Sequence, residues 1–217
     1  MTGEPASPFE SLADAYDEWF ESPEGRCIFL TEVGAFRNLL PLLPQPWLEV
    51  GVGSGRFAWE LGIEYGVDPS LALLRKGAVR GVQVIRGRGE ELALRAETFG
   101  TVFFIVTVCF LDRPIEALRE SRRVLAADGM LALGLVLSES PWGHFYRDKK
   151  MSGHRFYQHA TFYSYHELRD LLGCAGFAVT GVVSTLFQPP GHVRSVETPR
   201  RGYDPRAGFT VVSATKR

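Results

Sequence analysis

The feature that most constrains this chain is a run of three alternating glycines that directly follows an apolar stretch. Residues 47–50 read as the end of a β-strand, and a stretch that can form a helix begins at Arg56. Between them lie Gly51, Gly53 and Gly55. Glycines at this spacing remove the side chains that would keep a ligand away from the backbone, and a helix N-terminus presents free N–H groups. The turn therefore predicts a close-approach binding loop for a polar ligand.

The spacing of these glycines separates two kinds of ligand. The dinucleotide fingerprint G-x-G-x-x-G requires glycine at the position of Arg56, so the sequence disfavours a nicotinamide dehydrogenase. The pattern present is E-x-G-x-G-x-G, which begins at Glu49. For the turn taken alone, a tight strand-to-helix connection without a ligand is the plain alternative.

Length and charge limit the class of protein. The chain has 217 residues, 45% of them hydrophobic, which is enough for one substantial core and predicts a single domain. Its 24 basic and 25 acidic residues nearly cancel, so no overall field favours nucleic acid or an anionic membrane. We therefore expect no nucleic-acid or membrane partner. For the oligomeric state we expect a monomer or homodimer.

Three features bear on the compartment. Residues 1–11 carry neither the basic head nor the apolar core of a signal peptide, and the longest apolar run, residues 101–111, is too short to span a bilayer. Cys27, Cys109 and Cys174 are widely spaced and odd in number, which fits neither a disulfide framework nor a CxxC metal site. We expect a cytoplasmic protein without a metal site.

Short apolar runs alternate with helical periodicity along the chain, which is typical of an α/β sheet. The expected helices cover residues 9–20, 26–40, 56–61, 69–78, 114–128 and 164–176. The expected strands cover residues 47–50, 63–67, 82–85, 101–108, 130–136, 179–187 and 209–214. The last two strands have no helical pattern between them, so we expect them to pair antiparallel.

An acidic residue stands at the end of the second expected strand. Asp68 follows Glu49 by 19 positions and precedes Pro69. A carboxylate at that place can accept hydrogen bonds from both ribose hydroxyls of a nucleoside. The plain alternative is a helix N-cap, which Asp followed by proline favours and which is compatible with the ribose contact. Together with the glycine turn, Asp68 predicts a nucleoside-binding site.

Several segments, in the correct order, resemble one family. The E-x-G-x-G-x-G turn resembles motif I of the class I S-adenosylmethionine (SAM)-dependent methyltransferases, and the chain is most similar to the small stand-alone bacterial type, methyltransferase-11-like. Residues 122–131 are similar to the R-V-L-x-x-x-G-x-L turn of that family, and residues 161–177 to its F-Y-S-x-x-E-L…A-G-F helix. Residues 16–20 resemble its Y-D-x-W helix. The resemblance covers residues 16–217.

The resemblance implies a three-layer, Rossmann-like, doubly wound α/β sheet of about seven strands, mostly parallel with an antiparallel C-terminal strand. It divides the expected single domain into four parts. These are an N-terminal helical lid (1–44), a cofactor-binding core (45–137), a substrate segment (138–163) and a C-terminal helix with a strand pair (164–217).

The resemblance also implies which residues hold the cofactor SAM and its product S-adenosylhomocysteine (SAH). It places the glycine turn against the methionine part, Glu49 near the amino group and Thr107 to Cys109 beside the adenine and the sulfonium. For Cys109 we expect contact without covalent chemistry, because no histidine neighbours it in sequence. The expected cofactor-binding residues are Tyr16, Glu49, Val50, Gly51, Gly53, Gly55, Asp68, Pro69, Arg88, Gly89, Glu90, Thr107, Val108 and Cys109.

The expected adenine site departs from the family pattern. The family often carries G-D-A-E-x-L after its third strand, whereas this chain has G-R-G-E-E-L over residues 87–92. An Asp would accept from the adenine amino group, but Arg88 can only donate. Contact with adenine must then come from the backbone of Arg88 and Gly89 or from Glu90. The alternative is an ordinary exposed turn.

The stretch before the last expected helix is the candidate acceptor site. Residues 138–162 are aromatic and mixed in charge, and a long loop inside a compact domain is usually functional. A solvated surface segment is the equally plain alternative. Arg147 or Arg155 could bind a carboxylate or phosphate. The expected substrate residues are Trp19, Trp142, Arg147, Arg155 and Tyr163, and the candidate bases are Tyr16, His144, Tyr146, His154 and His159.

These inferences predict SAM-dependent methyl transfer to a small-molecule acceptor by direct in-line displacement. The alternative is a catalytically inactive SAM- or SAH-binding protein of the same fold, because Arg88 replaces the usual acid. Likewise, the helix around Tyr16 either lies over the cofactor as a lid or only packs its aromatic side chains on the sheet.

Overall fold

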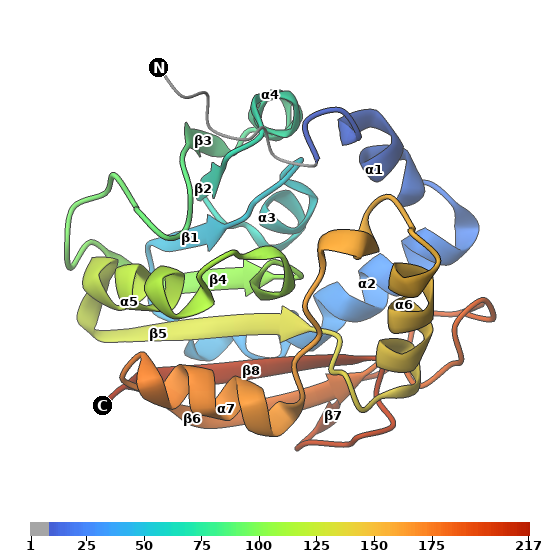
Figure 1. Ribbon diagram of the computed structural model, residues 1–217. Helices are drawn as coiled ribbons and strands as arrows, with labels where there is room; N and C mark the ends of the chain where they lie inside the picture. Colours follow the sequence, from blue (N-terminus) through green and yellow to red (C-terminus); the bar gives the residue numbers. More distant parts are fainter. Residues whose placement is uncertain (1–8) are drawn as a thin grey trace.

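The computed structural model describes residues 9–217, so the first eight residues of the polar N-terminus and of the expected lid lie outside the described part. The strands are β1 (Trp47–Val50), β2 (Tyr65–Asp68), β3 (Gln83–Arg86), β4 (Phe99–Ile105), β5 (Leu125–Leu135), β6 (Phe177–Thr185), β7 (Arg200–Arg201) and β8 (Phe209–Lys216). They form one sheet in the order β3-β2-β1-β4-β5-β8-β6-β7 (Figure 1).

The sheet is parallel from β3 to β5 and antiparallel beyond β5. Strand β8 pairs antiparallel with both β5 and β6, which confirms the predicted mixed sheet with its reversed C-terminal strand. The sheet has eight strands where we expected about seven. The additional strand, β7, pairs with Val183 and Ser184 of β6 and lies between the last two strands that we expected.

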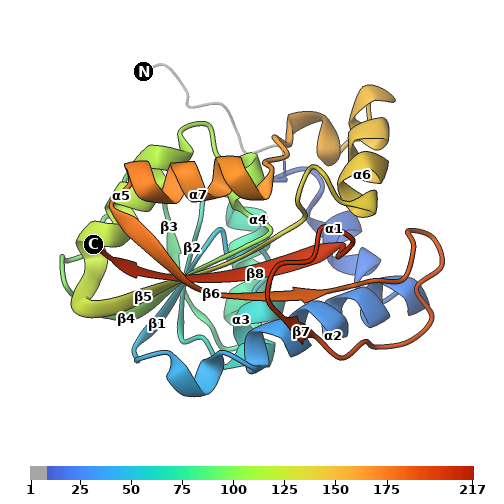
Figure 2. The same cartoon turned by 90° about the horizontal axis from the view of Figure 1, so that it is seen from below.

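Helices cover both faces of the sheet. The α-helices are α1 (Ala13–Trp19), α2 (Pro23–Arg37), α3 (Arg56–Leu61), α4 (Leu71–Val79), α5 (Pro114–Val124), α6 (Pro141–Met151) and α7 (Tyr165–Cys174). The short 3-10 helices are η1 (Leu40–Leu42), η2 (Val108–Phe110) and η3 (Tyr157–His159). Helices α5 and α7 lie on one face, and α2 and α3 lie on the other, which gives the predicted three layers (Figure 2).

Alternating side chains of the central strand β4 build the core on both faces. Phe103 and Ile105 belong to the cluster on the side of α2 and α3, whereas Val102 and Phe104 belong to the cluster on the side of α5 and α7. All four side chains are at most 4% exposed. This burial of both faces explains why the strand reads as a continuous apolar run in the sequence.

The helix that Pro114 opens is shorter than expected. It ends at Val124 rather than just before Gly129, because the backbone at Leu125 is extended and starts β5. The chain thereby passes from helix to strand without a glycine stop.

Residues 138–163 are not the loop that we expected, because they contain α6 and η3. The Ser140 side chain accepts a hydrogen bond from the Gly143 N–H at 2.9 Å, and Pro141 occupies the first turn. These are the usual signals of a helix start. The segment is therefore mostly ordered helix.

The carboxyl ends of the central strands face α1, α6 and η3 (Figure 1). The strand order turns between β1 and β4, and ligands of open α/β sheets bind at such a switch point. None of the described helices is long and apolar enough to cross a bilayer.

Candidate active site

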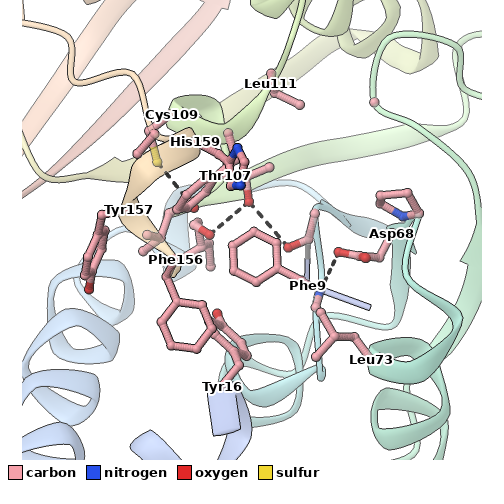
Figure 3. A pocket seen from close by; sticks show the side chains of 18 of the residues that line it. Phe9, Tyr16, Asp68, Leu73, Thr107, Cys109, Leu111, Phe156, Tyr157 and His159 are labelled. Atoms are coloured by element: carbon pink, nitrogen blue, oxygen red, sulfur yellow. Dashed lines mark hydrogen bonds between the residues drawn. The ribbon is translucent and has the colours of Figure 1, made fainter. Parts of the chain in front are cut away.

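The carboxyl ends of β1, β2 and β4 open into a cavity of about 660 Å³ (Figure 3). One wall comes from the glycine turn, the end of β2 and the loop after β3. The opposite wall comes from α2, the residue after β5, α6 and the segment through η3, and side chains of α1 close the cavity. Small-molecule sites usually measure roughly 300–1,000 Å³, so the cavity has room for a drug-sized ligand.

The glycine turn is closely packed beside the cavity. Gly51 and Gly53 have φ values of 76° and 53°, a region in which other residues are strained. A Cβ added at Gly51 would lie 2.2 Å from Thr107 Cγ2, whereas one at Gly53 would lie 3.7 Å from Tyr16 Cε1. Position 51 therefore requires glycine for space as well as for conformation.

Three of the expected cofactor residues do not line the cavity. Gly55 is needed for packing, since a Cβ there would lie 2.9 Å from Gly77 Cα. Val108 belongs to the core near α5, and Glu49 is 2% exposed, with no hydrogen-bond partner for its Oε2 in the described part of the chain. The expected cofactor residues that do line the cavity are Tyr16, Val50, Gly51, Gly53, Asp68, Pro69, Arg88, Gly89, Glu90, Thr107 and Cys109.

Asp68 is held in one orientation at the end of β2. Its Oδ2 accepts from the Gly53 N–H at 3.0 Å, and its Oδ1 accepts from the Ser70 N–H at 2.8 Å. The N-cap of α4 is Ser70, so the alternative role that we considered for Asp68 is wrong. Burial raises the pKa of Asp68 to about 6, although these two hydrogen bonds lower it. The carboxylate keeps lone pairs that can accept from a ligand in the cavity.

The loop after β3 explains how Arg88 is accommodated. Its guanidinium pairs with Asp112 on the rim and lies 3.6 Å from Oε2 of Glu90. Glu90 is buried, and its Oε1 has no hydrogen-bond partner within the described residues. A free acceptor therefore lies in the cavity wall next to the arginine that replaces the usual acid.

Asp17 ties α1 to the glycine turn. It accepts hydrogen bonds from Ser54 Oγ at 2.7 Å and from Arg56 Nε at 2.6 Å, and it pairs with Arg80 at 2.8 Å. Burial opposes the charge of Asp17, but the hydrogen bonds from these three side chains hold its pKa well below the usual range. In the sequence, Arg56 stands where a dinucleotide fingerprint would need glycine. In the structure, it anchors α1, the helix that carries Tyr16.

Replacing Asp17 with Asn is expected to lower the free energy of unfolding by about 1–3 kcal/mol at neutral pH, because two partly buried arginines lose their anion. The pKa of Asp17 in the folded protein lies below its usual 3.8. Its contribution is therefore present above that pH and is lost as the pH falls below it. Urea denaturation across this range measures the difference.

Asp14→Asn is the matched control for this prediction. Asp14 pairs with Lys76 at 2.7 Å, but its side chain is 84% exposed. The change should alter the free energy of unfolding by no more than about 0.5 kcal/mol. Equal effects of the two substitutions would show that Asp17 does not hold α1 in place.

The structure brings together some of the expected acceptor residues and not others. The cavity wall contains Tyr16, Trp19, Tyr146, His154, Arg155 and His159. His144 and Arg147 instead border a separate groove along α6. Trp142 is 2% exposed and donates its indole N–H to the Gln188 carbonyl at 2.9 Å, so it supports the fold. Tyr163 also lies outside the cavity wall.

The tyrosines of the cavity are suited to donate hydrogen bonds rather than to accept protons. Burial raises the pKa values of Tyr16 and Tyr146 well above their usual range, and that of Tyr157 to about 12. Burial likewise raises the pKa of the Cys109 thiol to about 12, which agrees with a non-nucleophilic role. Burial lowers the pKa of His154, whose Nδ1 accepts from the Phe156 N–H at 3.3 Å.

The cavity also contains residues that the sequence analysis missed. Val106 follows β4 with a φ of 53°, which is strained for a β-branched residue. Such a backbone conformation persists only where the surrounding structure fixes it. Glu32 stands in α2 on the same buried side as Ile28, Phe29 and Phe36. An acid within an apolar helical stripe is the signal that could have pointed to it.

Comparisons with known proteins point to one family. Residues 48–133 match the family described as a methyltransferase domain. An uncharacterized protein of Mycobacterium tuberculosis strain H37Rv is 42% identical over 203 residues, which cover 93% of this chain and 71% of that protein. An uncharacterized protein of Methanocaldococcus jannaschii is 33% identical over 208 residues, which cover 96% of this chain and 98% of that protein.

A solved structure gives the chemical class. The crystal structure of a SAM-dependent methyltransferase from Thermotoga maritima, described as a possible histamine N-methyltransferase, has a TM-score of 0.89 and 38% sequence identity to this chain. The match covers 97% of this chain and 98% of the other. Since sequence motifs, strand order and a close relative over nearly the whole length agree, the chain belongs to the class I SAM-dependent methyltransferase family.

Proposed function

We propose that this chain binds SAM and transfers its methyl group to a small-molecule acceptor in the same cavity. The main support for the proposal is that the cavity lining has two parts, one with the cofactor motifs and one without them. One wall contains the glycine turn and Asp68, and the other contains Glu32, Tyr146 and Tyr157, which no cofactor motif uses. The similarity to the Thermotoga maritima methyltransferase supports the same reaction class.

The first wall fits a nucleoside joined to an amino acid. The oriented Asp68 carboxylate can accept from the two ribose hydroxyls. Oε1 of Glu90, which has no partner among the described residues, can accept from the adenine amino group. The contact of Glu90 with the adenine amino group would supply the hydrogen-bond acceptor that Arg88 cannot provide. The left-handed turn at Gly51 and Gly53 leaves backbone, without side chains, for the methionine part.

When bound, SAM supplies a methyl group that is already activated by a positively charged sulfur. The task of the chain is then to hold the acceptor in line and to exclude water. Aromatic side chains of α1 and of the segment before η3 serve this purpose. Phe156 stacks on Phe9 with ring centroids 6.0 Å apart and meets Tyr16 edge-on at 6.1 Å.

Incubation with methyl-labelled SAM and a metabolite extract tests the proposal. We expect labelled small molecules with wild-type protein and less label, at the same subsaturating SAM concentration, with the Asp68→Ala variant. The inactive binding protein that the sequence left open predicts SAH binding without transfer to any acceptor in a broad set. That outcome would reject catalysis and leave the fold assignment intact.

The affinity for SAH should fall as the pH decreases below about 6. Only the ionised Asp68 can accept from both ribose hydroxyls, and its pKa is raised to about 6. One-proton linkage then makes binding about tenfold weaker at about pH 5 than at about pH 7.5. Titration calorimetry at both values measures the change. Asp68→Asn should bind weakly at both, and an unchanged wild-type affinity would contradict the role of Asp68.

A further inference from the structure

Glu32 is a buried carboxylate that the proposed cofactor contacts leave unused. It stands in the middle of α2, is 7% exposed and lines the same cavity as Asp68. No hydrogen bond or ion pair with another residue of the described range 9–217 engages it. Its carboxylate therefore lines the cavity without a partner among the residues that the structure describes.

Such a group requires a partner from elsewhere. An unpaired carboxylate removed from water is unfavourable, and buried polar groups in proteins are nearly always hydrogen-bonded. Burial raises the pKa of Glu32 to about 8. Among the cations that line the cavity, Arg88 pairs with Asp112 and Glu90. The other two rest on aromatic rings: Lys149 Nζ lies 4.6 Å from the Phe145 centroid, and Arg155 Cζ lies 5.0 Å from that of Phe156. A hydrogen-bond donor of a bound ligand would be a suitable partner for the Glu32 carboxylate.

The surroundings of Glu32 favour a cation over an anion. Tyr146 lies 4.3 Å from Tyr157 and is parallel to Phe162 at 6.4 Å, measured between ring centroids. All three rings line the cavity. Aromatic faces attract ammonium groups, whereas a carboxylate or phosphate would be repelled by Glu32. The expectation that Arg147 or Arg155 binds the carboxylate or phosphate of an acceptor is therefore disfavoured.

Given the proposed methyl transfer, we propose that the acceptor is a small primary or secondary amine whose ammonium group pairs with Glu32 between these aromatic rings. The methylated atom is then nitrogen. Because an ammonium has no lone pair, one proton must first leave it. The ammonium gives that proton to the Glu32 carboxylate. The lone pair that is left on the nitrogen then forms the new N–CH3 bond, and the electron pair of the broken C–S bond remains on sulfur. Glu32 afterwards returns the proton to water.

Calorimetric titration of the protein saturated with SAH tests amine recognition without turnover. The panel contains 2-phenylethylamine, 2-(imidazol-4-yl)ethylamine and 1,4-diaminobutane, each paired with the corresponding alcohol. We expect at least one amine to bind about 10- to 100-fold more tightly than its alcohol, as for a charged hydrogen bond. Glu32→Gln should abolish this preference, and Glu32→Asp should keep part of it.

Two controls separate amine recognition from folding and from the cofactor site. Glu18→Gln, at an exposed position outside the cavity wall, should leave the preference unchanged. Glu32→Gln should retain SAH affinity and a cooperative thermal transition, because it keeps the size of the side chain. No amine binding by wild type, or an equal preference in Glu32→Gln, would overturn the amine assignment. Transfer of label to a non-basic metabolite would do the same while leaving the proposed methyl transfer intact.

Discussion

Replacing Gly51 with Ala is expected to remove SAH binding that calorimetry can detect and to lower the free energy of unfolding by about 2–5 kcal/mol. Two costs add at this position. The backbone is left-handed, with φ of 76°, and the new Cβ would lie 2.2 Å from Thr107 Cγ2. Relief of that contact moves Thr107 or the turn, and both line the cavity.

Gly62→Ala is the matched control for this substitution. Gly62 has nearly the same φ, 77°, but an added Cβ would meet nothing within 4 Å. It should cost only the conformational strain of about 1–2 kcal/mol and leave SAH affinity unchanged. If both variants bound SAH as the wild type does, the glycine turn would have no part in the cofactor site.

Replacing Asp68 with Ala is expected to weaken SAH binding by about 1–3 kcal/mol, which corresponds to a rise in Kd of roughly 5- to 150-fold. The variant loses the acceptor for the ribose hydroxyls and frees the Gly53 N–H that the carboxylate holds at 3.0 Å. Asp112→Ala provides the control, because Asp112 also lines the cavity but its side chain is 75% exposed. Its effect should stay below about 1 kcal/mol. Unchanged affinity of Asp68→Ala would remove Asp68 from the site.

The sheet could be predicted from the sequence because its signals are local. The central strand β4 is buried on both faces and reads as an uninterrupted apolar run, and the capping box at Ser164 marks the start of α7. Helix α6 also has local signals, because Ser140 and Pro141 mark its start and Trp142, Phe145 and Tyr146 recur at helical spacing. The expectation of a loop over residues 138–162 depends on aromatic, mixed-charge composition alone and is wrong for that reason.

The two walls of the cavity differ in how far the sequence could predict them. The wall with Gly51 and Asp68 follows from short motifs at strand ends, where chain order places residues at one edge of the sheet. The wall with Glu32 and Tyr157 depends on how α2 and η3 pack across that edge. The acid at position 32 within an apolar helical stripe marks Glu32 as unusual but does not show what it faces, and Tyr157 has no local signal, so tertiary packing decides their place.

A crystal structure of the protein with SAH would test the proposed methyl transfer most directly. We expect both ribose hydroxyls within hydrogen-bond distance of Asp68 and the homocysteine part along Gly51 and Gly53. We also expect the sulfur to face open space bordered by Glu32 and Tyr157. SAH bound outside this cavity, or a sulfur closed off by side chains with no room for an acceptor, would contradict the proposed methyl transfer.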